Sequence, residues 1–319
     1  MTMRRTVLWA LASILLLSGL TLFRWISTEA RAVGIQLNVK DLPAYGLNLI
    51  PPTDPHFQEE LSIPLAAKQG NSLEEGLRPY SVLFKNKGKK TVVGYRLTWE
   101  MTKADGTVSL RQNGGVNPGA LMGNRQQGLE NRALVGGFAV KPNSMAFVSL
   151  AGAMSLDGGS GMGGFAGGLA DQAAMDQLLR AKDTTSLVNA AIADLRNFTT
   201  ITVSIDGVFF EDGTFVGPDA TGLFADVEAE LNAKRDLMEE LAFALDKKQS
   251  VAEVFSYIEE VAASSLPDRK LDREDLYNLY KKMEAETLLR MGSKMERQKV
   301  LAISQQEYHQ ASWPKLKKL

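Results

Sequence analysis

Residues 91–101, TVVGYRLTWEM, alternate between apolar and polar side chains, and this stretch decides how the rest of the chain is interpreted. From residue 93 onward one parity holds only apolar side chains, those of Val93, Tyr95, Leu97, Trp99 and Met101. The other parity holds Val92, Arg96, Thr98 and Glu100. A period of two with one apolar face is typical of a β-strand that is buried on one side.

The stretch 198–210 repeats this alternation. Ile201, Val203 and Ile205 are expected to face inward, and Thr200, Thr202, Ser204 and Asp206 outward. Because the apolar parity changes at Val208 and Phe210, we expect a β-bulge at Gly207. With turn signals such as Asp105-Gly106 between the strands, the pattern predicts an α+β chain whose residues 80–217 form an antiparallel β-sandwich, immunoglobulin-like or related.

The segments around these strands differ in composition. Six of the eleven prolines lie between Pro43 and Pro79, so residues 33–79 are expected to be extended and free of helix. Inside the sandwich, glycine-rich loops are expected at 111–131 and 151–168, followed by a helical insertion at 169–196.

Beyond residue 217 the apolar spacing becomes helical, which predicts a helical region over 218–319. Ser250 with Glu253 matches a capping box, and Asp272 suits the start of a further helix. The last helix is expected to bury one stripe, formed by Leu276, Tyr280, Met283, Thr287, Met291 and Met295. Because the apolar stripes are wide, we expect these helices to pack on one another or on the sandwich.

The first 32 residues have the features of an export signal. Two arginines at Arg4 and Arg5 precede an apolar run at 7–23, and Ala30-Arg31-Ala32 resembles a signal-peptidase site. The alternative is an uncleaved membrane anchor, since seventeen residues are near the shortest span of a bilayer. Either interpretation places the rest of the chain outside the cytoplasm, in the periplasm or cell envelope.

Composition excludes several classes of site. The 319 residues include no Cys and two His, which rules out disulfide scaffolds, thiolate metal sites and Cys nucleophiles. The 36 basic and 37 acidic side chains are balanced, so a nucleic-acid partner is not expected. Gly159-Ser160-Gly161-Met162-Gly163-Gly164 matches a dinucleotide motif, but no βαβ series surrounds it, and we expect a loop there and no cofactor.

Two groups of residues are candidates for a site. Strand order predicts that the basic turn and the glycine-rich loops share one end of the sandwich, where a polar or anionic ligand would meet Lys87, Lys89, Lys90, Arg111, Asn113 and Arg125. The carboxylates at the last hairpin, Asp206, Glu211 and Asp212, are the candidates for a metal site or an acid–base pair. The lysine-rich end, residues 313–319, is interpreted as a disordered solubilising tail, with anionic lipid as the alternative.

These features favour a noncatalytic binding or scaffolding module of the cell envelope. Its partner would be an envelope protein or a polar or anionic ligand, with membrane attachment through the N-terminal segment as an option. The alternative is an extracytoplasmic carboxylate-dependent hydrolase or metal-binding protein. The module is favoured because a rigid frame with adaptable loops suffices for binding, whereas an enzyme needs an activated nucleophile, base or metal.

Overall fold

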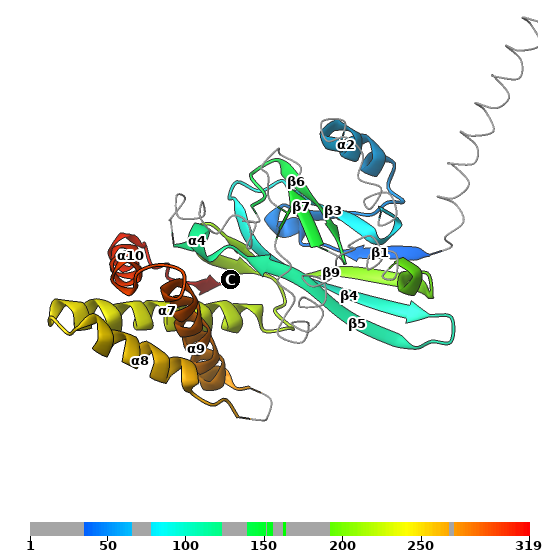
Figure 1. Ribbon diagram of the computed structural model, residues 1–319. Coiled ribbons are helices and arrows are strands. Elements are labelled where there is room, and N and C mark those ends of the chain that lie inside the picture. Colours follow the sequence, from blue (N-terminus) through cyan, green and yellow to red (C-terminus); the bar gives the residue numbers. More distant parts are fainter. Residues whose placement is uncertain are drawn as a thin grey trace, which may run out of the picture.

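The computed structural model describes residues 35–65, 78–122, 139–150, 152–155, 162–163, 192–267 and 271–319. These residues form a mixed α+β protein with two sheets and a C-terminal group of helices (Figure 1). The predicted export segment at 1–32 lies outside the described ranges. Within those ranges, none of the helices combines the length and the apolar character needed to cross a bilayer.

The larger sheet contains the two strands that the sequence predicts most clearly. Its order is β11-β10-β9-β4-β5, and β1 also pairs with β9. The strands are β1 (Gln36–Lys40), β4 (Val92–Lys103), β5 (Val108–Val116), β9 (Phe198–Phe210), β10 (Thr214–Val216) and β11 (Lys317–Lys318). β1 runs parallel to β9 and β11 parallel to β10, so this sheet is mixed. The prediction of a purely antiparallel sheet is therefore wrong. Both parallel strands reach the sheet through long connections, which hairpin-based reasoning does not anticipate.

The smaller sheet is antiparallel throughout and has the order β2-β3-β6-β7-β8. Its strands are β2 (Leu47–Ile50), β3 (Ser81–Asn86), β6 (Ser144–Ser149), β7 (Gly152–Ser155) and β8 (Met162–Gly163). Short 3-10 turns, η1 (Pro43–Tyr45) and η2 (Arg78–Tyr80), precede β2 and β3.

One hydrophobic core is built from both sheets. The larger sheet contributes Tyr95, Leu97, Trp99 and Met101 of β4, all at most 3% exposed, together with Ile201, Val203 and Ile205 of β9. The smaller sheet contributes Val82, Phe84, Ala146 and Val148. The predicted inner faces of both long strands are therefore confirmed. A sandwich of immunoglobulin type stays a prediction.

Three irregularities interrupt the pairing of the two long strands, one of them at the far end between Thr102 and Lys103. The β4–β9 register shifts where Arg96 pairs with Gly207 and Leu97 with Ile205, so Asp206 is the extra residue of the predicted bulge. A second shift lies between Val92 and Gly94. As a result Val92 joins the core between the sheets and Val93 faces outward, which is the reverse of the predicted assignment.

The predicted loops at 111–131 and 151–168 are partly strand. Arg111 to Val116 belong to β5, followed by the short helix α4 (Pro118–Leu121), and β7 and β8 lie in the second stretch. Gly114 explains the first error: its φ is +156°, and a Cβ there would lie 2.1 Å from the carbonyl oxygen of Tyr95. Glycine is needed for this close approach of two strands and does not mark a loop.

The proline-rich segment is not free of helix, because α2 (Pro55–Leu65) occupies its centre. Pro55 stands at the first helical position, where its missing N–H leaves no bond unmade. The Asp54 carboxylate accepts from the backbone N–H of His56 at 2.8 Å, as a helix-capping residue does. Phe57 of α2 is fully buried against Leu83 and Phe147 of the smaller sheet.

Four helices follow the larger sheet: α7 (Leu223–Asp246), α8 (Val251–Ala263), α9 (Arg273–Gly292) and α10 (Arg297–Gln310). The capping box of Ser250 with Glu253 and the cap at Asp272 are confirmed. The helices share a core of their own, and the first half of α7 packs on the larger sheet through Leu223, Val227 and Leu231. The predicted packing is therefore confirmed on both counts.

The predicted stripe of the last helix is wrong in two respects. The chain ends α9 at Gly292, where a Cβ would lie 2.7 Å from the Phe255 ring, and then begins α10. Within α9 the buried positions include Leu279, Ala285 and Leu288, whereas Met283 is exposed. Since α7, α8 and α10 all contact α9, its buried surface is not the single stripe that hydropathy suggests.

The C-terminal residues are not a disordered tail. Trp313 and Leu316 pack on the cluster formed by α7 and the larger sheet. β11 then pairs with β10, and the backbone N–H of Leu319 donates to the carbonyl oxygen of Phe215 at 3.1 Å. The chain thus returns from the helices to the sheet (Figure 1).

Candidate functional site

The basic turn between β3 and β4 carries three exposed lysines, Lys87, Lys89 and Lys90. Its backbone is fixed by Asn86, which is fully buried. The Asn86 Nδ2 donates to the carbonyl oxygens of Lys90 at 2.8 Å and Val140 at 2.9 Å, and its Oδ1 accepts from the Gly88 N–H at 2.9 Å. The turn therefore presents Lys87 and Lys89 on a rigid support.

Lys90 is engaged by one of the predicted metal ligands. Its Nζ lies 2.6 Å from the Asp212 carboxylate and above the Phe210 ring. Partial burial opposes ionisation of Asp212, but the Lys90 ion pair and the hydrogen bonds from Thr214 outweigh it and lower the pKa of the carboxyl. A lysine of the predicted anion site and a carboxylate of the predicted metal site therefore form an ion pair with each other.

The three predicted metal ligands are not brought together. Glu211 lies beside the start of β4, where its carboxylate accepts from the Thr91 N–H at 3.3 Å. Asp206 is buried and accepts from the Ala220 N–H at 2.8 Å and from both the N–H and the hydroxyl of Thr221. In the part of the chain that the structure describes, no group of three His, Asp or Glu is arranged to hold a metal ion.

The predicted ligand residues are also spread along the sheet. Arg111 pairs across from Trp99, seven residues along β4 from Val92, which places it about 23 Å from the basic turn. It forms an ion pair with Asp194 at 2.5 Å. The expectation that Arg111 shares an end with the lysines is therefore wrong, because Arg111 lies within a strand. Arg125 lies outside the described residues.

Asn113 holds the two sheets together. Its Oδ1 accepts from the Trp99 indole N–H at 2.8 Å, and its Nδ2 donates to the Ser149 carbonyl oxygen. Trp99 is fully buried, so its indole needs a partner inside the protein. The contacts of Asn113 serve the fold.

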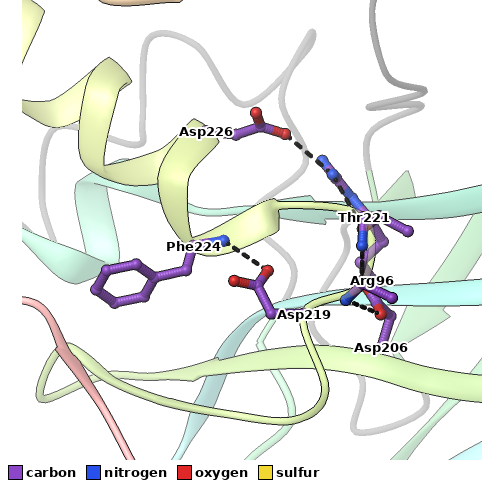
Figure 2. Close-up of polar contacts among 7 residues, drawn as sticks. Arg96, Asp206, Asp219, Thr221, Phe224 and Asp226 are labelled. Carbon is purple, nitrogen blue, oxygen red and sulfur yellow. Dashed lines mark hydrogen bonds and ion pairs between the residues drawn. The ribbon is translucent and has the colours of Figure 1, made fainter. Parts of the chain in front are cut away.

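A polar network joins the larger sheet to the start of α7 (Figure 2). Arg96 of β4 forms an ion pair with Asp226 of α7 at 3.0 Å, and its guanidinium also donates to Thr221. Asp219 accepts from the Phe224 N–H at 3.0 Å through one oxygen and binds Lys318 at 2.7 Å through the other. Together with the hydrogen bonds of Asp206, this network holds the connection between β10 and α7 against three strands of the larger sheet, β4, β9 and β11.

Further charged groups lie where α7 faces α9 and α10. Lys234 contacts Glu307 at 2.8 Å and Glu284 at 3.5 Å. Although burial opposes the charge of Lys234, these two carboxylates raise its pKa. Desolvation and the nearby Glu284 carboxylate raise the pKa of Glu230 to about 7, against the opposing effect of Lys234.

The outward face of the larger sheet changes character along its length. At the Gly207 end it is covered by α7, which packs on Val93, Phe209 and Phe215. Beyond Arg96 the outward side chains of four strands form three rows, all exposed or half-buried. These rows are Gln36–Thr200–Thr102–Val108, Asn38–Thr202–Glu100–Leu110 and Lys40–Ser204–Thr98–Gln112, and we call them the polar face.

Only part of the polar face could be predicted from the sequence. The outward residues of β4 and β9 were assigned from their alternation, but Arg96 and Asp206 belong to the covered end. The outward residues of β5 were missed because Gly114 and Gly115 suggested a loop. The signal that identifies them is the alternation of Val108, Leu110 and Gln112 directly after a hairpin turn.

Comparison of the chain with family models, curated proteins and solved structures found no match.

Proposed function

We propose that this protein is a noncatalytic binding or scaffolding module of the cell envelope that acts outside the cytoplasm. The observation that carries the proposal is the polar face: twelve adjacent side chains on a regular sheet, rich in hydroxyl and amide groups. Such a surface offers many hydrogen-bonding groups on a frame that is rigid before binding. Its two charged members, Lys40 and Glu100, have opposite sign, so the face suits a neutral polar partner better than an anion.

The carboxylates that an enzyme of this composition would use support the same proposal. Asp206 caps the connection to α7, and Asp212 pairs with Lys90. The hydrolase or metal-binding alternative requires these groups to converge on one substrate or ion. Their observed contacts instead lie in two separate parts of the fold, the connection to α7 and the start of β4.

The location can be tested because the natural chain has no Cys. Ala104→Cys places one thiol in the exposed β4–β5 turn, and a membrane-impermeant maleimide is added to intact cells that express the full chain. A chain outside the cytoplasm is labelled before lysis to the same extent as after it. Labelling only after lysis would contradict the proposed location.

Binding at the polar face can be tested with the same reagent. Thr202→Cys lies at the centre of the face, and Ala104→Cys is the matched control on the turn beside it. We expect Thr202→Cys to react several-fold more slowly in isolated envelopes than in the purified full chain, because a bound partner excludes the reagent. The rate at Ala104→Cys should be the same in both. Equal rates at both positions would remove the polar face from the proposal.

A further inference from the structure

One end of the two sheets collects lysines from separate segments of the chain. The basic turn between β3 and β4 lies at this end. The turn before β6 lies beside it, because the Asn86 Nδ2 and the Val92 N–H both donate to the Val140 carbonyl oxygen, at 2.9 and 3.0 Å. Lys141, which follows Val140, is therefore a neighbour of the lysines in the basic turn.

The C-terminal strand brings two more lysines to the same end. The Lys90 Nζ lies 3.3 Å from the Thr214 hydroxyl in β10, and Thr214 is the register partner of Lys317 in β11. The Lys317 N–H donates to the Gly213 carbonyl oxygen at 3.1 Å, and the Lys315 backbone lies against the same glycine. With β10 and β9 between β11 and β4, Lys317 is about 14 Å from the start of β4.

Five of these lysines form no ion pair in the part of the chain that the structure describes. All five are exposed, and we call them the basic end: Lys87, Lys89, Lys141, Lys315 and Lys317. The carboxylates beside them already have ion pairs or hydrogen bonds within the chain; these are Asp41, Glu211, Asp212 and Asp219. An anion that approaches this end therefore meets several lysines whose charge no described carboxylate neutralises.

The basic residues of this end suit a diffuse negative charge better than a single anionic ligand. All of them are lysine, and no arginine occurs in the segments that build the end, which are 42–46, 86–92, 140–143, 211–215 and 315–319. Sites that recognise one phosphate or carboxylate typically use the planar, bidentate guanidinium of arginine, whereas lysine acts as a point charge. Lysines on separate segments instead add up their attraction to an extended anionic surface.

Two exposed apolar side chains favour a membrane over a soluble polyanion. Leu319, directly after β11, is 60% exposed, and Tyr45 in η1 is 39% exposed. Tyr45 lies beside the basic turn, because the Lys87 N–H donates to the carbonyl oxygen of the next residue, Gly46, at 2.7 Å. A soluble polyanion offers these side chains no apolar partner, whereas a bilayer takes up tyrosine and aliphatic groups at the level of its headgroups.

From this combination we infer that the basic end binds the surface of a membrane that contains anionic lipids. The lysines supply attraction to the lipid phosphates, and Tyr45 and Leu319 contact the boundary of the acyl chains. The basic end is separate from the polar face, which lies beyond Arg96 toward the β4–β5 turn. The two surfaces can therefore be tested independently.

The test uses an environment-sensitive fluorophore on a single cysteine of the purified full chain, which has no natural Cys. Pro142→Cys places the label at an exposed position beside Lys141, and Ala104→Cys places it in the turn at the opposite end. We expect a blue shift at Pro142→Cys with vesicles of phosphatidylcholine and phosphatidylglycerol, and none with phosphatidylcholine alone. At Ala104→Cys the two kinds of vesicle should give the same spectrum.

Charge removal in the Pro142→Cys background locates the contact. Lys87→Gln combined with Lys89→Gln should raise the concentration of anionic vesicles needed for half of the shift at least about tenfold, because each lysine near anionic lipid contributes about fivefold. Lys294→Gln combined with Lys299→Gln removes the same charge from exposed positions of the helical region and should leave that concentration unchanged. The melting temperature of each variant verifies that it is folded.

Three results would overturn the inference. The first is the same spectrum at Pro142→Cys with both kinds of vesicle. The second is an equal loss in the two double-lysine variants, because the effect would then reflect net charge and not this surface. The third is a shift with soluble polyphosphate but not with anionic vesicles, which would assign the basic end to a soluble polyanion.

Discussion

The two halves of the larger sheet's outward face differ, although the same strands run through both. At one end Arg96, Asp206 and the aromatic side chains of Phe209 and Phe215 are covered by α7 and by the returning C-terminus. At the other end, which we call the open half, the side chains of the polar face are exposed or half-buried. The bulge at Asp206 separates them, because it changes which residues of β9 point outward. One extra residue therefore converts a polar strand surface into an apolar docking surface.

The largest expected effect comes from the residue at this boundary. Asp206→Ala removes the acceptor of three donors in Ala220 and Thr221 and should lower the free energy of unfolding by about 3 kcal/mol, since buried donors lose their partner. Urea unfolding measures the change. Thr202→Ala, on the same strand in the open half, is the control and should change stability by less than about 0.5 kcal/mol. Similar losses at both positions would mean that the two halves do not differ as described.

A smaller effect is expected from pH, and it should arise only on the covered side. The pKa of Glu230 is raised from its ordinary 4.5 to about 7, so between these pH values the folded chain binds a proton that the unfolded chain has released. The contribution of Glu230 to stability is therefore greatest below pH 4.5 and is lost as the pH rises through 7.

Glu230→Gln keeps this position neutral at every pH. We expect the variant to be more stable than the natural chain by about 2 kcal/mol at pH 8 and to match it near pH 4; this is less than the full shift would give, because Glu230 is only half-buried. Melting curves at both pH values measure the difference. Glu239→Gln, at an exposed position of the same helix, is the comparison. A stabilisation by Glu230→Gln that is the same at both pH values would contradict the assignment.

The smallest expected effect concerns the C-terminal strand. Lys318→Ala removes the partner of Asp219, whose side chain is 7% exposed, and should lower the free energy of unfolding by about 1 kcal/mol. Lys317→Ala is the control, because Lys317 joins the sheet through its backbone N–H, which donates to the Gly213 carbonyl oxygen. Chemical denaturation of the two variants measures the difference. A loss at Lys317 as large as at Lys318 would show that the ion pair contributes nothing specific.

The parts of the fold that could be predicted from sequence are those with a local signal. The alternation in β4 and β9, the bulge at Gly207 and the capping box at Ser250 all follow from residues within one turn or strand. What failed depends on contacts between distant segments. Gly114 suggested a loop because the sequence around it does not show that the Tyr95 backbone approaches it. The lysines near the C-terminus suggested a tail because no local pattern indicates that β11 pairs with β10.

The candidate site followed the same division. The prediction that one turn carries Lys87, Lys89 and Lys90 is confirmed. Arg111 was predicted to lie near that turn because its strand was interpreted as a loop. Asp206 and Asn113 were chosen for their chemistry, but each makes hydrogen bonds to groups far away in the sequence that occupy it structurally. A polar residue that is buried by a distant segment cannot be told from an exposed one by composition alone.

The pairing of β1 with β9 has a consequence for the order in which the protein assembles. Gln36 meets Thr200, so the first described strand finds its partner only after about 160 further residues have been synthesised. Until then Leu37 and Val39 have no sheet to enter, and the chain must close a very long loop at the cost of entropy. Folding should therefore be slow, and the larger sheet can be completed only after most of the chain has been synthesised.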